Sequence, residues 1–211
     1  MKQLSFFPSA HEESFEFSSC YKKKRYSGVM EINYDLDRQM VSFQANKQEP
    51  IFRWVKYREG FSKNLILYII DHLNLHSHAV ILDPFAGSGS SAFAAHELGM
   101  KAIAVELLPV GCFIMECRNH FEACGYDDVL KWAEKTLESM GTWANELATY
   151  KFNHITITNG AFPEETEEKL GRFMSWARKQ TNEYRKFLEF VAFSILEDIS
   201  YTRKDGQYLR W

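Results

Sequence analysis

The sequence lacks several features that would assign a protein to a class at once. It has four cysteines with no C-x-x-C pair, its apolar runs are far shorter than the ~20 residues of a membrane-spanning helix, and its start has no signal-peptide pattern. We therefore expect reduced thiols, no metal site and a cytoplasmic protein without a membrane partner. The five prolines are isolated from one another, so the chain contains no Pro-Pro motif.

The chain also has no excess of positive charge. The formal net charge is −3 at pH 7, whereas a protein that binds nucleic acid tightly usually carries a basic surface. The basic run at residues 22–25 predicts a solvated loop rather than a phosphate contact. We therefore expect this chain alone to hold nucleic acid only weakly.

Hydrophobic periodicity divides the 211 residues into three parts. Residues 1–50 are expected to form an irregular N-terminal extension with a hairpin joined around Asp37. Residues 51–150 are expected to form an α/β part. Its predicted elements are a helix capped by Ser62, strand 79–82, helix 91–98 and strand 101–107, with the parallel strands buried on both faces.

The second half of the chain has mainly helical patterns. Pro109 is a favourable first residue for a helix that carries Cys112, Cys117 and Cys124 as core or groove thiols rather than metal ligands. We predict one long helix over 126–148, a short strand over 152–159, and helices over 164–178 and 183–199. Residues 151–211 are thus expected to be a helical segment.

The most informative stretch is DPFAGSGSSA, residues 83–92. Gly87 and Gly89 match the first glycines of a dinucleotide-binding loop, and Glu106 lies where a ribose-binding acid belongs. Asp83, however, would repel a pyrophosphate and suits a ligand with an ammonium or sulfonium group. The pattern therefore favours S-adenosylmethionine, with an NAD-dependent oxidoreductase and a glycine turn without a ligand as weaker alternatives.

The stretch DPFAGSG resembles the cofactor motif of the DNA amino-methyltransferases, which methylate adenine N6 or cytosine N4. The resemblance implies that Phe85 shapes the pocket and that Glu106 binds the ribose hydroxyls of S-adenosylmethionine. It further implies contacts to the methionine part of the cofactor from Asp83, from Phe61 and Ser62, and from the backbone of Ala86, Gly87, Ser88 and Gly89.

The family's catalytic motif, a polar residue followed by Pro-Pro and an aromatic residue, has no counterpart in these 211 residues. We therefore assign no catalytic residue. We expect a partial Rossmann-like methyltransferase fold with appended helices that lacks the catalytic half. Such a chain would be a truncated gene product, a fragment, or one subunit of a split enzyme whose catalytic half a second polypeptide supplies. DNA would then be a partner through the complete enzyme, in a restriction-modification or similar system.

Two alternatives keep the fold but change the function. A non-catalytic remnant or regulatory module would bind the cofactor without transferring its methyl group. A methyltransferase acting on RNA or protein would keep the chemistry, although the Pro-Phe pair at residues 84–85 argues weakly against such a substrate.

Overall fold

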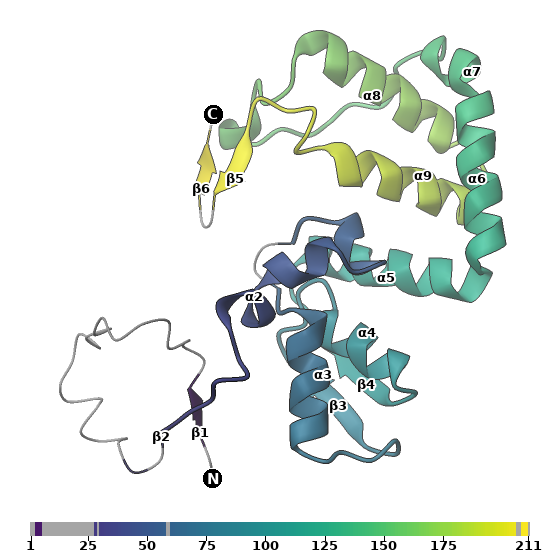
Figure 1. Cartoon of the computed structure of the whole chain (residues 1–211). Helices are drawn as coiled ribbons and strands as arrows, with labels where there is room; N and C mark the ends of the chain where they lie inside the picture. The colour runs from purple at the N-terminus through teal and green to yellow at the C-terminus, as the bar shows by residue number, and fades with distance from the viewer. Residues whose placement is uncertain (1–2, 6–27, 29, 58–59, 206–207, 211) are drawn as a thin grey trace. The chain divides into compact units, whose positions relative to one another are not determined.

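The computed structural model describes residues 3–5, 28, 30–57, 60–205 and 208–210, and the basic run at 22–25 lies outside them. The chain forms two compact units (Figure 1). The first contains Met1–Arg53 and Tyr57–Glu106, and the second contains Trp54–Lys56 and Leu107–Trp211. No helix in the described part of the chain has the length and apolar character needed to cross a membrane.

The first unit begins with short elements. They are β1 (Gln3–Ser5), β2 (Met30–Ile32), α2 (Arg38–Val41) and the 3-10 helices η1 (Phe43–Lys47) and η2 (Phe52–Trp54), of which η2 ends in the second unit. The predicted hairpin around Asp37 is wrong, because β2 pairs in parallel with β1 and Asp37 starts a helix. The Asp37 Oδ1 atom accepts a hydrogen bond from the Met40 N–H at 2.6 Å. This local cap outweighs the strand-like alternation of residues 38–45.

The centre of the first unit is the predicted strand–helix–strand motif. Helix α3 (Lys63–His72) precedes β3 (Val80–Asp83), α4 (Ser90–Glu97) and β4 (Lys101–Ala104). The prediction that the two strands are adjacent and parallel is confirmed, with Leu82 opposite Ile103. Figure 1 shows α3 and α4 beside the strands, and Ile70, Ala95 and Met100 form the small core between these elements.

Within the described residues of the first unit, the expectation that this sheet is buried on both faces is wrong. Ile81 and Ala102 point toward the core of α3 and α4. The alternate side chains, by contrast, are more than half exposed: Val80 (53%), Leu82 (63%), Ile103 (55%) and Val105 (52%). Side chains alternate across a strand, so helices packed on one face leave the other face bare.

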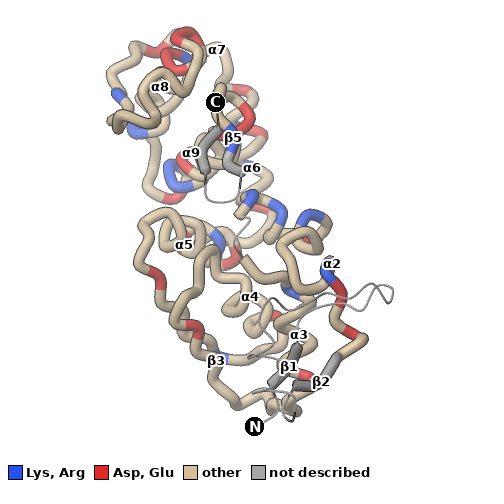
Figure 2. Tube along the Cα trace, turned by 90° about the vertical axis from the view of Figure 1, so that its left-hand side faces the viewer, with Lys and Arg blue, Asp and Glu red and all other residues tan. Residues whose placement is uncertain are grey.

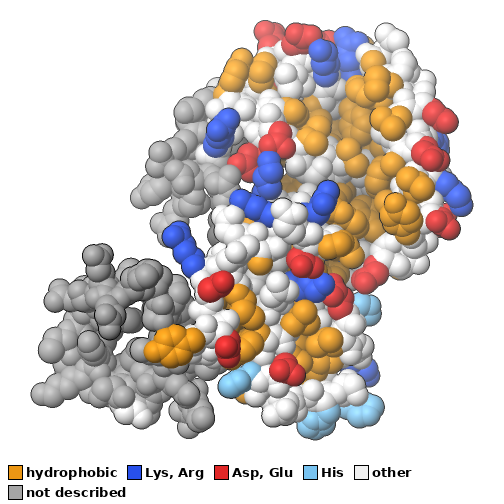
Figure 3. All heavy atoms as spheres, in the orientation of Figure 1, with side chains coloured by type: hydrophobic (Ala, Val, Ile, Leu, Met, Phe, Trp, Pro, Cys, Tyr) orange, Lys and Arg blue, Asp and Glu red, His pale blue; other side chains and the backbone are white. Residues whose placement is uncertain are grey.

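The second unit is mainly helical. It contains α5 (Pro109–Cys124), α6 (Tyr126–Glu138), α7 (Met140–Ala144), η3 (Thr156–Thr158), α8 (Glu164–Ala177), α9 (Asn182–Ile195) and the antiparallel strands β5 (Arg203–Asp205) and β6 (Tyr208–Arg210). Figure 3 shows hydrophobic side chains gathered on its visible face and bordered by charged ones. Burial raises the pKa of the Cys117 thiol to about 12, so this cysteine belongs to the core, as predicted.

Two predictions for the second unit are wrong. The single helix expected over 126–148 divides at Ser139, which ends α6 and precedes α7. A helix is weakened by a glycine in its interior, here Gly141. The strand expected over 152–159 contains η3 instead, because the Thr158 hydroxyl accepts the Ile155 N–H at 3.1 Å and closes a local turn.

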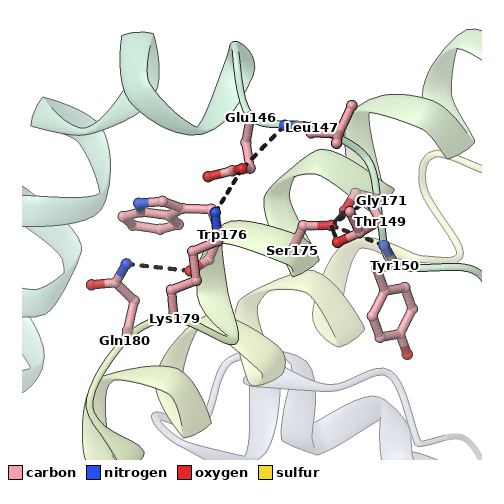
Figure 4. A network of polar contacts seen from close by, with 9 residues as sticks. All are labelled: Glu146, Leu147, Thr149, Tyr150, Gly171, Ser175, Trp176, Lys179 and Gln180. Atoms are coloured by element: carbon pink, nitrogen blue, oxygen red, sulfur yellow. Dashed lines mark hydrogen bonds and ion pairs between the residues drawn. The ribbon is translucent and has the colours of Figure 1, made fainter.

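Ser175 on α8 holds the segment that follows α7 through hydrogen bonds (Figure 4). Its hydroxyl oxygen accepts the N–H groups of Thr149 at 3.0 Å and Tyr150 at 2.9 Å, and its proton is donated to the Gly171 carbonyl at 2.7 Å. A Cβ on Gly171 would lie 3.1 Å from the Tyr150 carbonyl oxygen, so the segment approaches the helix closely.

Replacing Ser175 with Ala is expected to lower the free energy of unfolding by about 1 to 2 kcal/mol, because the Tyr150 N–H loses the Ser175 hydroxyl as its acceptor and the Thr149 N–H keeps only the Leu147 carbonyl. The measurement is urea unfolding followed by circular dichroism. Ser194→Ala is the matched control, since the Ser194 hydroxyl donates to the Val191 carbonyl within its own helix. Equal losses in the two variants would contradict the proposed role of Ser175.

Candidate functional site

The carboxylate of Asp83 organises the loop that leaves β3. Its Oδ1 atom accepts the Phe85 N–H at 3.0 Å, and its Oδ2 atom accepts a short hydrogen bond from the Ser91 hydroxyl. Asp83 therefore joins the end of the strand to the start of α4. The negative charge also lies beside a helix N-terminus, where the helix dipole favours it.

The backbone of the glycine loop is strongly curved. Gly87 and Gly89 have φ values of +55° and +84°, which L side chains rarely adopt, and Gly89 is the N-cap of α4. The loop is also attached to the end of β4, because the Ala86 N–H donates to the Val105 carbonyl at 3.0 Å. The N-terminus of an eight-residue helix is thus held beside the carboxyl ends of both strands.

Glu106 lies against the same loop. Its Oε2 atom accepts the Gly87 N–H at 2.7 Å, although 19 residues separate the two positions. The structure therefore brings together the glycines and the second acid that the sequence indicated. Carboxylate oxygens have several lone pairs, so Glu106 can accept a ligand hydroxyl as well as this N–H.

Tyr57 is a site residue that sequence reasoning missed. A Cβ built on Gly87 would lie 2.9 Å from the Tyr57 Cε1 atom, so the tyrosine ring packs directly on the glycine loop. A Cβ on Gly60 would lie 3.4 Å from the Ser90 hydroxyl, which places the backbone at Gly60 against the start of α4. No periodic pattern in the sequence marks Tyr57. Its one sequence signal is that glycines, Gly60 and Gly87, stand at the two positions where its ring comes close.

The structure treats Phe61 and Ser62 differently. Phe61 is 53% exposed, whereas Ser62 is fully buried. The Ser62 hydroxyl accepts the Leu65 N–H at 3.0 Å, as predicted for a helix cap, and donates to the Met40 carbonyl. Its side chain is therefore used within the fold, and a ligand contact from Ser62 stays a prediction. Phe85, at 87% exposed, is free to contact a ligand.

A second residue missed by the sequence, Asn46, holds the turn at Phe61. The buried Asn46 amide donates to the Phe61 carbonyl at 2.8 Å and accepts the Lys63 N–H at 2.9 Å. The Lys63 ammonium group pairs with Glu97 at 2.6 Å and Glu49 at 3.2 Å, and the hydrogen bond that it donates to Glu97 is the main cause that raises the pKa of Lys63. These contacts fix the start of α3.

The chemistry of the loop follows from its charges. Two carboxylates, Asp83 and Glu106, accept main-chain N–H groups of one glycine loop, which leads into the N-terminus of α4. Such a site attracts a ligand that combines positive charge with hydroxyl groups, and it repels a pyrophosphate. Among the described residues, no group of three His, Cys, Asp or Glu side chains converges to hold a metal ion.

Comparisons with known proteins agree on one family. A profile of DNA methylases, the N6/N4 methyltransferases, matches residues 2–115. The Type II methyltransferase M.BsoBI of Geobacillus stearothermophilus is 38% identical over 191 residues, which is 90% of this chain and 37% of the relative. M.AvaI of a Nostoc strain is also 38% identical, over 90% of this chain and 39% of its own length.

The chain thus spans well under half the length of these curated relatives. A shorter match is the Type II methyltransferase M.MjaII of Methanocaldococcus jannaschii, 26% identical over 88 residues, which is 41% of this chain and 16% of the relative. No solved structure matches the chain significantly.

Proposed function

Because this chain belongs to the family of DNA amino-methyltransferases, we propose that its first unit binds S-adenosylmethionine for the methylation of adenine N6 or cytosine N4 in DNA. The observation that carries this proposal is the glycine loop held between two carboxylates, with Glu106 on the Gly87 N–H. The relatives, both Type II methyltransferases, support a role in a restriction-modification system.

Each predicted site residue has a place in this proposal. The backbone of Ala86, Gly87, Ser88 and Gly89 and the carboxylate of Asp83 would hold the methionine part of the cofactor. Glu106 would bind the ribose hydroxyls, since a carboxylate can accept several hydrogen bonds at once. The exposed rings of Phe61 and Phe85 would border the pocket, whereas Ser62 would act by capping α3. The bound cofactor supplies an activated methyl group on its sulfonium.

The proposal leaves the catalytic half to another polypeptide segment. The 211 residues contain no Pro-Pro motif, and the matched region is 37% of the Geobacillus relative. Figure 2 shows basic and acidic residues interspersed along the described trace. This distribution is consistent with a chain that does not bind DNA tightly by itself. We propose that the complete enzyme has a Rossmann-like fold, of which β3, α4 and β4 are the cofactor-binding beginning.

The same absence of a Pro-Pro motif favours a second candidate function, a binding module that has lost methyl transfer. Such a module would still bind S-adenosylmethionine. Cofactor binding therefore tests the site, and methyl transfer with the other half supplied separates the two functions.

The test is isothermal titration of the purified chain with S-adenosylmethionine. Replacing Glu106 with Ala is expected to weaken binding by ~1 to 3 kcal/mol, the scale of lost charge-assisted hydrogen bonds. Glu134→Ala, an exposed acid on α6, is the matched control and should leave the affinity unchanged. Equal affinities of Glu106→Ala and the unaltered chain would remove Glu106 from the site, and binding of NAD instead would overturn the choice of cofactor.

A further inference from the structure

Asn46 is a polar residue on the buried side of η1. Helix η1 turns Phe43 and Asn46 to the same side, because side chains three residues apart eclipse one another in a 3-10 helix. Both are buried, with Phe43 at 7% and Asn46 at 1% exposed. A buried amide is costly unless its hydrogen bonds are made. The presence of Asn46 at this place is therefore explained by the hydrogen bonds that it makes.

Both hydrogen bonds of the Asn46 amide go to the turn that precedes α3. Its Nδ2 atom donates to the Phe61 carbonyl at 2.8 Å, and its Oδ1 atom accepts the Lys63 N–H at 2.9 Å. The Ser62 hydroxyl, which lies between these two residues in sequence, donates to the Met40 carbonyl. The turn is thus held to residues 40–46 by side chains from both segments.

The contact at the Phe61 carbonyl sets the direction of the next N–H group. In a planar trans peptide the C=O and the following N–H point in opposite directions, and the described chain has no cis peptide bond. Because the Phe61 carbonyl points to the buried Asn46 amide, the Ser62 N–H points away from it. Within the described part of the chain, no group accepts this N–H. The Ser62 N–H is therefore available to a ligand.

The same turn lies against the helix that follows the glycine loop. A Cβ on Gly60 would lie 3.4 Å from the hydroxyl of Ser90, the first residue of α4. The proposed function places the methionine part of the cofactor at this loop. Because the Ser62 hydroxyl is used within the fold, a cofactor contact from Ser62 would be made by its main-chain N–H. A carboxylate is a strong acceptor for such a group.

We propose that Asn46 is a positioning residue for S-adenosylmethionine. It holds the peptide between Phe61 and Ser62 so that the Ser62 N–H meets the carboxylate of the cofactor's methionine part. Asn46 is buried and acts through this peptide rather than by a contact of its own. The inference rests on the proposed function and adds to it how the carboxylate is recognised. It also gives the segment that contains η1 a role in supporting the cofactor site.

The test compares two ligands by isothermal titration. They are S-adenosylmethionine and its decarboxylated analogue, which keeps the sulfonium, ammonium and ribose groups but lacks the carboxylate. Asn46→Ala removes both hydrogen bonds to the turn. We expect this variant to bind S-adenosylmethionine at least about tenfold more weakly, and the analogue less than about threefold more weakly.

A second variant keeps the test decisive if Asn46→Ala does not fold. Asn46→Asp has nearly the same shape and keeps an acceptor for the Lys63 N–H, but it loses the donor to the Phe61 carbonyl. The same selective loss is expected. Ile70→Val is the matched control, because Ile70 lies in the core of the same unit further along α3. Its melting temperature should fall while its affinity for both ligands stays unchanged.

Three results would overturn the inference. The first is that the Asn46 variants weaken both ligands equally or weaken neither. The second is that the unaltered chain binds the two ligands equally, since the carboxylate would then make no contact. The third is that the unaltered chain binds neither ligand, which would refute the proposed function and this inference with it. The first two results leave the binding of S-adenosylmethionine in place and refute only the positioning by Asn46.

Discussion

Purified residues 1–211 are expected to transfer no labelled methyl group to DNA on their own. Transfer to an exocyclic amine requires the nitrogen to be held in line with the sulfonium methyl, and positioning of this kind supplies ~7 to 11 kcal/mol of a barrier. The resemblance assigns that task to a Pro-Pro-aromatic motif that these residues lack. The measurement is incorporation of label from S-adenosylmethionine into DNA, with and without a polypeptide that supplies the motif.

The control for this result is cofactor binding by the same preparation, which shows that the first unit is folded. Strong labelling of DNA by the chain alone would mean that the catalytic centre has been misplaced. The first candidate for a catalytic residue would then be Asn159, which follows η3 in the turn TNGAFP. Binding without labelling, even when the missing motif is supplied, would favour the non-catalytic module.

Replacing Gly87 with Ala is expected to reduce binding of S-adenosylmethionine by at least about tenfold. The substitution forces an L residue to φ +55°, which costs about 1 kcal/mol or more, and its Cβ would lie 2.9 Å from the Tyr57 ring. The loop must then shift, and the Gly87 N–H moves away from Glu106. Isothermal titration measures the loss.

Gly99→Ala is the matched control for this prediction. Gly99 also has a left-handed backbone, with φ +71°, but a Cβ there meets nothing within 4 Å. The melting temperature of both variants should fall because of the backbone strain, whereas only Gly87→Ala should bind the cofactor more weakly. A parallel loss of affinity in both would show that strain in the unit, and not the geometry of the loop, weakens binding.

The sequence by itself determined the elements that depend on local chemistry. Ser62 and Pro109 start helices as expected, because a side-chain cap and a fixed proline φ act within one turn. The strand–glycine loop–helix–strand order was also readable, and the family follows from DPFAGSG and is confirmed by the comparisons. In each of these cases the deciding residues lie close together along the chain.

Local chemistry also explains two failures. Alternating apolar residues suggested strands at 38–45 and 152–159, but the Asp37 carboxylate and the Thr158 hydroxyl accept main-chain N–H groups and close turns there. A pattern of hydrophobicity records which faces could be buried. It does not record which side chain will accept a hydrogen bond from a main-chain N–H group and so close a turn.

Only the tertiary structure decided how the loop is supported and what covers the sheet. Tyr57 on Gly87, Asn46 at the turn of Phe61 and Ser91 on Asp83 depend on where separate segments meet in space. The bare side chains of Leu82 and Ile103 have the same apolar character as buried ones. Sequence periodicity identifies an apolar face, but whether that face is covered depends on the packing of other segments, which periodicity does not encode.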